Sequence, residues 1–233
     1  MHPDTKCVHA GGFPDSLKKG INSPIFTSSA YEYLGTDERL YQRYFNTPNQ
    51  DAAAGKICEL EGAEEGIIFS SGMAAISTVL LTLLRSGDHA VVQDEVYGGS
   101  HAFISQQFER LGISFTFVST DPNAIEAALT ESTRVIFFES PTNPLLNVIG
   151  LRDIAEIGKR NGVVTVIDNT FATPINQNPC KLGIDVVVHS GTKYLGGHSD
   201  LYCGAALTNK ALAGQIRKTA TQLGGSLNAP SCY

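Results

Sequence analysis

The stretch Val163-Val164-Thr165-Val166-Ile167, followed at once by Asp168-Asn169-Thr170, indicates the fold most clearly. All five residues of the run are β-branched and four are apolar, so the run predicts a strand with two buried faces. Strands of this kind occur where helices cover both sides of a mostly parallel sheet. We therefore predict an α/β fold, with a polar segment beginning where this strand ends.

Short apolar runs alternate with helical patterns on both sides of this stretch. Six further strands are predicted at residues 66–69, 89–93, 114–118, 134–138, 185–189 and 202–207. Helices are predicted at residues 51–60, 73–84, 100–111, 123–129, 151–160 and 210–223. The pattern predicts one large domain over residues 51–233, built on a mostly parallel seven-stranded sheet with helices on both faces.

Residues 1–50 have a different composition. They are rich in Gly, Pro, Ser, Asn and Tyr and hold no long periodic pattern, so we predict an extended N-terminal arm. The arm is too aromatic for a typical disordered tail. Its rings are Tyr31, Tyr33, Tyr41, Tyr44 and Phe45. We expect the arm to dock onto a neighbouring subunit or onto the main domain.

Composition narrows the classes of partner and compartment. A net charge of -6 with interspersed acidic and basic residues gives no basic face for nucleic acid. The longest apolar runs are too short to span a bilayer, and the first residues lack a secretory signal, so we expect a cytoplasmic protein without membrane contact. Five scattered cysteines without a Cys-x-x-Cys pair argue against a disulfide framework and a structural zinc site.

Several predicted strands end in residues that suit ligand binding, which in open α/β sheets occurs beyond the carboxyl ends of the strands. The first leads into Ser70-Ser71-Gly72-Met73, where small residues would let backbone amides approach a phosphate, or would form a tight turn. The second leads to Tyr97, whose ring could stack on a flat heterocycle or pack with its hydroxyl in water. The fourth leads to a loop in which Pro141 and Pro144 could hold the Asn143 amide in the site, or form a simple turn.

Two further strand ends carry reactive groups. Asp168 follows a fully apolar strand, and because an unpaired buried carboxylate costs several kcal/mol, we expect a cationic partner for it; the alternative is a capping role. The sixth strand brings Ser190, Thr192 and Lys193 into one glycine-rich turn, which suits a phosphate and a reactive amine. A carboxylate, an amine, a stacking ring and phosphate-binding amides together match what pyridoxal 5'-phosphate (PLP) requires.

With these motifs, the chain resembles the Cys/Met-metabolism (trans-sulfuration) family of PLP-dependent enzymes, whose large domain is aspartate aminotransferase-like (fold type I). The resemblance covers nearly the whole chain. Its most specific segment is Ser-Gly-Thr-Lys-Tyr-Leu-Gly-Gly-His-Ser-Asp at residues 190–200, and residues 71–75, 139–144 and 168–171 support it.

The resemblance implies a role for each of the strand-end residues. Lys193 would bind PLP as a Schiff base, and Asp168 would pair with the ring nitrogen. Tyr97 would stack on the ring, and Asn143 would lie near the phenolic oxygen. The residues that would hold the phosphate are Gly72, Met73, Ser190 and Thr192.

The resemblance also gives the arm a purpose. In the family a Tyr-x-Arg motif in the arm reaches the phosphate of the neighbouring subunit, and Tyr41-Gln42-Arg43 stands in that place. This implies active sites shared between chains, in a dimer that pairs into a homotetramer. It also implies a small C-terminal domain that carries the arginine for the substrate carboxylate, and this sequence stops before it. The family usually continues with Asn-Pro-Thr, whereas this chain has Asn46-Thr47-Pro48.

We therefore expect an enzyme that eliminates or replaces a group at the β or γ carbon of a sulfur amino acid or an acylated homoserine. Cystathionine synthesis or cleavage is the reaction we favour. Lys193 would remove the α-proton, and Tyr97 or Tyr41 could assist proton transfer to the leaving group. Methionine γ-lyase, which carries a cysteine where Gly99 stands, and O-acylhomoserine sulfhydrylase are alternatives. A non-catalytic PLP-binding or oligomerisation module is an alternative of another class.

Two other kinds of site are disfavoured. A metal site through His101, His189, His198 and a cysteine lacks a pair of ligands at short spacing on one element. A Rossmann dinucleotide site would need Gly-x-Gly-x-x-Gly after the first strand, and Ser70-Ser71-Gly72-Met73 stands there instead.

Overall fold

The computed structural model of the protein describes residues 1–37 and 39–233. Within that part of the chain, seven strands form one sheet, and its order is β1-β7-β6-β5-β4-β2-β3. In chain order the strands are β1 (Glu65–Phe69), β2 (His89–Gln93), β3 (Ser114–Val118), β4 (Thr133–Glu139), β5 (Val164–Asp168), β6 (Val186–Ser190) and β7 (Gly204–Thr208). The predicted α/β fold is confirmed.

The sheet is parallel except at one strand. β7 pairs antiparallel with both β1 and β6, whereas the pairs β6–β5, β5–β4, β4–β2 and β2–β3 are parallel. Because two antiparallel pairings restore the original direction, β1 runs the same way as β6. The carboxyl ends of β1, β6, β5, β4 and β2 therefore lie along one edge, as the prediction of a shared binding edge requires.

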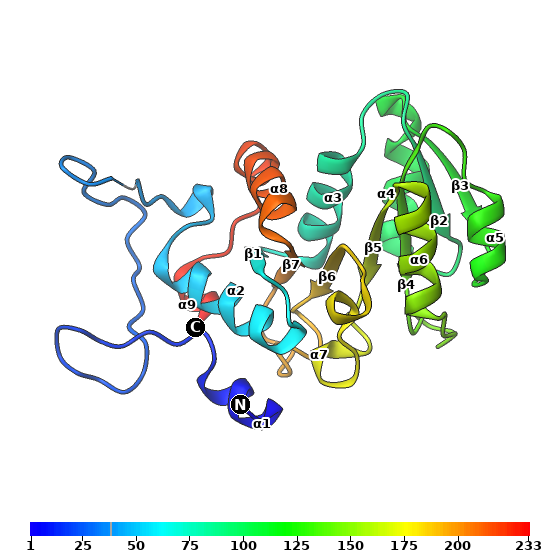
Figure 1. Ribbon diagram of the computed structural model, residues 1–233. Helices are drawn as coiled ribbons and strands as arrows, with labels where there is room; N and C mark the ends of the chain where they lie inside the picture. The colour runs from blue at the N-terminus through cyan, green and yellow to red at the C-terminus, as the bar shows by residue number, and fades with distance from the viewer. Residues whose placement is uncertain (38) are drawn as a thin grey trace.

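Helices cover both faces of the sheet, and two separate cores result. Side chains of α3 (Gly72–Leu83), α4 (Gly98–Gln107) and α8 (Lys210–Leu223) pack with Phe137, Val166 and Val188 on one face. Side chains of α2 (Pro48–Glu61), α5 (Pro122–Ala127) and α6 (Leu151–Asn161) pack with Phe138, Ile167 and Val187 on the other. In Figure 1, α3 and α8 lie side by side above the sheet.

The predicted boundaries agree with the structure within a few residues. β2, β3 and α8 begin and end at the predicted residues. β5 is displaced by one residue, so that Asp168 is its last residue and not the first residue after it. The remaining short helices are α7 (Thr173–Asn176), α9 (Ala229–Cys232), η2 (Glu109–Leu111) and η3 (Pro179–Leu182), of which the sequence pattern indicated only η2, as the end of a longer helix.

The N-terminal arm contains two short helices that the sequence pattern did not indicate, α1 (Pro3–His9) and η1 (Gln42–Tyr44). The arm contacts the main domain through Lys6, whose Nζ donates to the Glu59 carbonyl at 2.8 Å, and through Phe26, whose N–H donates to Asn49 Oδ1 at 2.9 Å. Arg43 of η1 contacts the main domain as well, by donating to the Thr221 carbonyl at 2.8 Å, and Figure 1 shows stretches of residues 13–37 extending beyond the β1 edge of the sheet. No helix within the described residues is long and apolar enough to cross a membrane.

Candidate functional site

The ends of β1 and β6 approach each other across the start of β7. Gly204, the first residue of β7, pairs with Phe69 on one side and Ser190 on the other. A Cβ atom at Gly204 would lie 2.0 Å from the Ser71 carbonyl oxygen, and one at Gly72 would lie 2.8 Å from Ser190 Cβ. Glycine at both positions therefore allows the two strand-end segments to pack closely and to share one surface.

This surface presents donors to an anion. The Ser71 hydroxyl caps α3 by accepting from Ala74 N–H at 3.1 Å, while the amides of Gly72 and Met73 donate to no group among the described residues. The first amides of a helix carry partial positive charge. The Ser190 hydroxyl faces Gly72 and makes no hydrogen bond within the described part of the chain. Amides and a hydroxyl arranged in this way suit a phosphate group.

Asp168 lies at the next strand end, 8% exposed. Its Oδ1 accepts from the N–H and the hydroxyl of Thr170, at 3.0 and 2.5 Å, and the Thr170 hydroxyl oxygen in turn accepts from Ser190 N–H at 2.8 Å. The local capping role is therefore present. Thr170 was not among the predicted site residues, although its place two residues after Asp168 could have suggested this bond.

The expected cation is not a side chain of the described part of the chain. No lysine or arginine there pairs with Asp168, and its Oδ2 accepts no hydrogen bond from described residues. Burial raises the pKa of Asp168, and the Thr170 bonds and nearby His189 oppose the rise. A buried carboxylate with a vacant oxygen therefore suits a cationic group on a ligand.

A second carboxylate lies beside the first. Glu139 is the last residue of β4 and is in register with Asp168, so both side chains leave the same face of the sheet. Burial and the charge of Asp168 raise the pKa of Glu139 to about 8, against its amide hydrogen bonds. Glu139 was not among the predicted site residues, because the pairing of β4 with β5 is a long-range feature that no local pattern reveals.

Glu139 binds the backbone of two predicted site residues. Its Oε1 accepts from Tyr97 N–H at 2.6 Å, and its Oε2 accepts from Asn143 N–H at 3.3 Å. Tyr97 precedes α4 and is 46% exposed as a residue. A Cβ at Gly99 would lie 2.5 Å from Tyr97 Cε1 and 3.2 Å from Met73 Sδ, so the ring lies close to the start of α3. Tyr97 is therefore brought close to Met73, one of the residues predicted to bind a phosphate.

Lys193 and Thr192 lie in the turn after β6. The Thr192 hydroxyl accepts from Cys203 N–H at 3.0 Å, and the Lys193 amide donates to the Ser190 carbonyl at 3.2 Å, so the turn is fixed to β6 and to the segment before β7. Lys193 is exposed, and its Nζ forms no hydrogen bond or ion pair with described residues. Its amine is free for a covalent bond.

The arm residues lie elsewhere in this chain. The Arg43 guanidinium stacks on the rings of Tyr41 and Tyr44, with 5.5 Å to each ring centroid, and donates to the Thr221 carbonyl of α8 at 2.8 Å. No contact within the described residues joins Tyr41 or Arg43 to Lys193 or Asp168. A role for these two residues in a neighbouring chain's site stays a prediction.

A buried polar network lies on the opposite face of the same sheet edge. His189 Nε2 is 2.7 Å from Glu61 Oε1, and Glu61 also accepts from the side-chain amides of Asn169 and Asn178, at 2.8 and 3.4 Å. Gln177 completes the network by donating to Asn169 Oδ1 at 2.8 Å. No local pattern in the sequence indicates this network. Its members come from distant parts of the chain, and His189 is committed to it, which further disfavours the metal site considered above.

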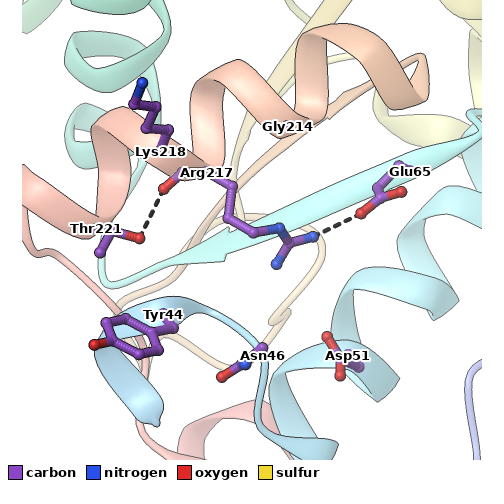
Figure 2. A pocket seen from close by; sticks show the side chains of 8 residues that line it. All are labelled: Tyr44, Asn46, Asp51, Glu65, Gly214, Arg217, Lys218 and Thr221. Atoms are coloured by element: carbon purple, nitrogen blue, oxygen red, sulfur yellow. Dashed lines mark hydrogen bonds and ion pairs between the residues drawn. The ribbon is translucent and has the colours of Figure 1, made fainter. Parts of the chain in front are cut away.

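Two hollows are lined by other residues. One of about 570 Å³ lies between α8, β1 and the start of α2, and Figure 2 shows Arg217 reaching Glu65 across it, at 2.7 Å. Another, of about 950 Å³, separates the N-terminal segment from α2 and the turn that holds Tyr194. Neither is lined by Lys193 or Asp168. With Tyr97 and Lys193 exposed, the strand-end site is an open surface in the single chain.

The strand-end residues fit PLP on four structural grounds. There is a set of unbonded donors around Gly72 and Ser190, and a buried carboxylate at Asp168 that pairs with no lysine or arginine of the described residues. There is also an exposed ring at Tyr97 and an unpaired amine at Lys193. All four features lie along the edge of the sheet formed by the carboxyl ends of β1, β6, β5 and β2.

Comparison with known proteins gives a consistent family. The family model described as Cys/Met metabolism PLP-dependent enzyme matches residues 4–233. Cystathionine beta-lyase of Coxiella burnetii is 43% identical over 98% of this chain and 60% of the relative. Cystathionine gamma-synthase of Mycobacterium leprae is 44% identical over 88% of this chain and 54% of the relative.

A solved structure agrees over the whole chain. The crystal structure of cystathionine gamma-lyase from Lactobacillus plantarum complexed with L-serine has a TM-score of 0.95 and 36% identity, covering 100% of this chain and 61% of that one. The chain thus spans about three fifths of the length of the relatives that it matches.

Proposed function

Because the chain belongs to the family of Cys/Met metabolism PLP-dependent enzymes, we propose that it holds PLP at the carboxyl edge of its sheet. We propose further that the protein acts in sulfur amino-acid metabolism by elimination or replacement at the β or γ carbon, in cystathionine synthesis or cleavage. The observation that carries the proposal is the vacant oxygen of buried Asp168, placed between the free donors at Gly72 and Ser190 and the loop that holds Tyr97.

Each strand end has one task in this proposal. The amides of Gly72 and Met73, with Ser190 and Thr192, bind the phosphate at the positive end of α3. Asp168 holds the ring nitrogen in its charged form, since that charge offsets the cost of burying the carboxylate.

Further tasks fall to the groups beside the ring. Tyr97 stacks on the ring and excludes water from one side, and Asn143 orients the ring through its oxygen substituent. Lys193 binds the cofactor covalently through Nζ.

The reaction depends on proton transfers by the chain's own groups. Bound PLP supplies an electron-withdrawing ring that acidifies the α carbon of an attached amino acid. The Lys193 amine would move the α-proton of the substrate. The hydroxyl of Tyr97, or of Tyr41 from a neighbouring chain, can give a proton to the leaving group.

The substrates and partners follow from the same proposal. The substrate is a sulfur amino acid or an acylated homoserine, consistent with relatives named cystathionine beta-lyase, gamma-synthase and gamma-lyase. The site of one chain is completed by Tyr41 and Arg43 of another, within a homotetramer, which suits the open surface around Lys193. A cytoplasmic location suits five cysteines that all occur as free thiols.

Gly99 bears on the choice among reactions. Its missing side chain leaves room for the Tyr97 ring, whereas a Cβ there would lie 2.5 Å from Tyr97 Cε1. The cysteine that methionine γ-lyases carry at this place would therefore require a different ring position, which favours cystathionine chemistry.

The test is the visible absorption spectrum of the protein with added PLP, before and after borohydride reduction, followed by peptide mass spectrometry. We expect a band that shifts on reduction and a PLP adduct on Lys193, both lost in Lys193→Ala. A spectrum identical to that of free PLP would refute the proposed cofactor site. Turnover of cystathionine that persisted unchanged in Lys193→Ala would refute the proposed proton transfer.

A further inference from the structure

The carboxylate of Glu139 links two loops that follow different strands. One oxygen accepts from the backbone of Tyr97 at 2.6 Å and the other from the backbone of Asn143 at 3.3 Å. The Glu139 N–H donates to Gln93 Oε1 at 2.7 Å, which fixes the residue to β2 as well. Glu139 is 3% exposed, so these hydrogen bonds are shielded from water.

The position of Glu139 relates these loops to the ring. It lies in register with Asp168 at the adjacent strand end, on the same face. The residue that fixes the Tyr97 backbone is therefore next to the proposed partner of the ring nitrogen. A carboxylate buried against a like charge, as its raised pKa reflects, is a costly way to hold a loop. Such a cost indicates a functional constraint.

We infer that Glu139 is a positioning residue of the PLP site, which holds the backbone of Tyr97 so that its ring stacks on the cofactor. This inference rests on the proposed function, because it requires PLP beside Asp168. Glu139 touches neither the cofactor nor the substrate in this assignment. It acts through Tyr97.

Glu95 provides a matched control. Its Oε2 accepts from the side chains of Thr120, Thr142 and Asn147, at 3.1, 3.3 and 2.7 Å, and so it joins the same two loops. It binds the backbone of neither Tyr97 nor Asn143. Loss of its charge therefore loosens the loops without releasing the Tyr97 amide.

The experiment is a double-mutant cycle read by PLP affinity. The dissociation constant would be measured by absorbance titration for wild type, Glu139→Gln, Tyr97→Ala and the double variant. We expect Glu139→Gln to weaken binding about tenfold, because a side-chain amide has one oxygen and can accept from only one of the two backbone N–H groups. In the Tyr97→Ala background its effect should fall within about twofold, since there is no ring left to position.

Glu139→Asp separates position from charge. It keeps a negative group beside Asp168 but is too short to reach both amides, so we expect weakened binding and a reduced induced circular dichroism of the bound cofactor. If Glu139→Asp binds like wild type, or if Glu139→Gln and Tyr97→Ala are additive, Glu139 acts by charge or by stability and the inference is wrong. Glu95→Gln should be additive with Tyr97→Ala.

The wild-type titration keeps the two proposals distinguishable. A wild-type protein that binds no PLP overturns the proposed function and this inference together. A wild-type protein that binds PLP, with additive variants at Glu139 and Tyr97, overturns the positioning role alone. Thermal unfolding of each variant without cofactor shows whether a loss of binding merely follows a loss of fold.

Discussion

Two buried acidic groups lie on opposite faces of one sheet edge, and their surroundings differ. On the α2 face, Glu61 is fully buried and is hydrogen-bonded to His189, Asn169 and Asn178. On the α3 face, Glu139 lies beside Asp168, with no lysine or arginine paired to either acid among the described residues. The first arrangement satisfies a buried charge within the fold. The second leaves a requirement that a bound cation can meet, and this distinguishes a structural cluster from a binding site.

The largest effect on stability is expected for the Glu61 network on the α2 face. Glu61→Ala leaves buried His189 Nε2 without its partner and removes one acceptor from each of the Asn169 and Asn178 side-chain amides, so it should lower the free energy of unfolding by about 3–5 kcal/mol. Denaturant unfolding without cofactor measures this. Glu59→Ala, in the same helix but exposed and paired with Lys6, should cost under about 1 kcal/mol. Equal losses in the two variants would remove the distinction between the two acid clusters.

The contrast between the two clusters also shows which features of the fold and the site local sequence patterns can predict. β-branched runs such as residues 163–167 place strands within a residue or two, and strand-end residues such as Asp168 follow from that. Glu139 was visible in the sequence, but its meeting with Asp168 depends on which strands pair and in what register. Glu61 and His189 are 128 positions apart, so their contact exists only in the folded chain. Local pattern predicts the elements, and long-range packing decides which polar groups are satisfied.

A second prediction concerns how the stability of the protein depends on pH through Glu139, which lies beside Asp168. Glu139 has a folded-state pKa of about 8, above its value of 4.5 in the unfolded chain. Between these two pH values the Glu139 carboxyl is protonated in the folded chain and ionised in the unfolded chain. The stabilisation that this protonation gives the folded state is fully present below pH 4.5 and is lost as the pH rises through 8. Without cofactor, the unfolding free energy should fall across this window by at most about 1.4 kcal/mol per pH unit for this group.

The pH profile has a direct control. Glu139→Gln cannot titrate, so the difference between its profile and that of wild type isolates the contribution of this carboxyl, while Asp168 and the other titrating groups remain. Denaturant unfolding at steps from pH 5 to pH 8.5 supplies both profiles. Parallel profiles would mean that Glu139 is not protonated in the folded chain. Bound PLP should flatten the wild-type slope, because its ring charge favours ionised acids nearby.

The smallest expected change in unfolding free energy is a gain and not a loss, and it is the most direct test of the difference between the Glu61 and Asp168 clusters. Asp168→Asn keeps an oxygen for the Thr170 N–H and hydroxyl but removes one of two adjacent charges, so the protein without cofactor should gain about 1 kcal/mol at pH 8. If Asp168 pairs with the ring nitrogen as proposed, loss of its charge should lower the PLP affinity at least about tenfold. Asp94→Asn, exposed after β2 at the same edge, should change neither quantity. A residue whose removal stabilises the fold and weakens the ligand is held for the ligand, because folding alone would favour its replacement. Were Asp168→Asn to destabilise the protein as Glu61→Ala does, Asp168 would be a structural residue, and the two faces of the sheet edge would not differ in kind.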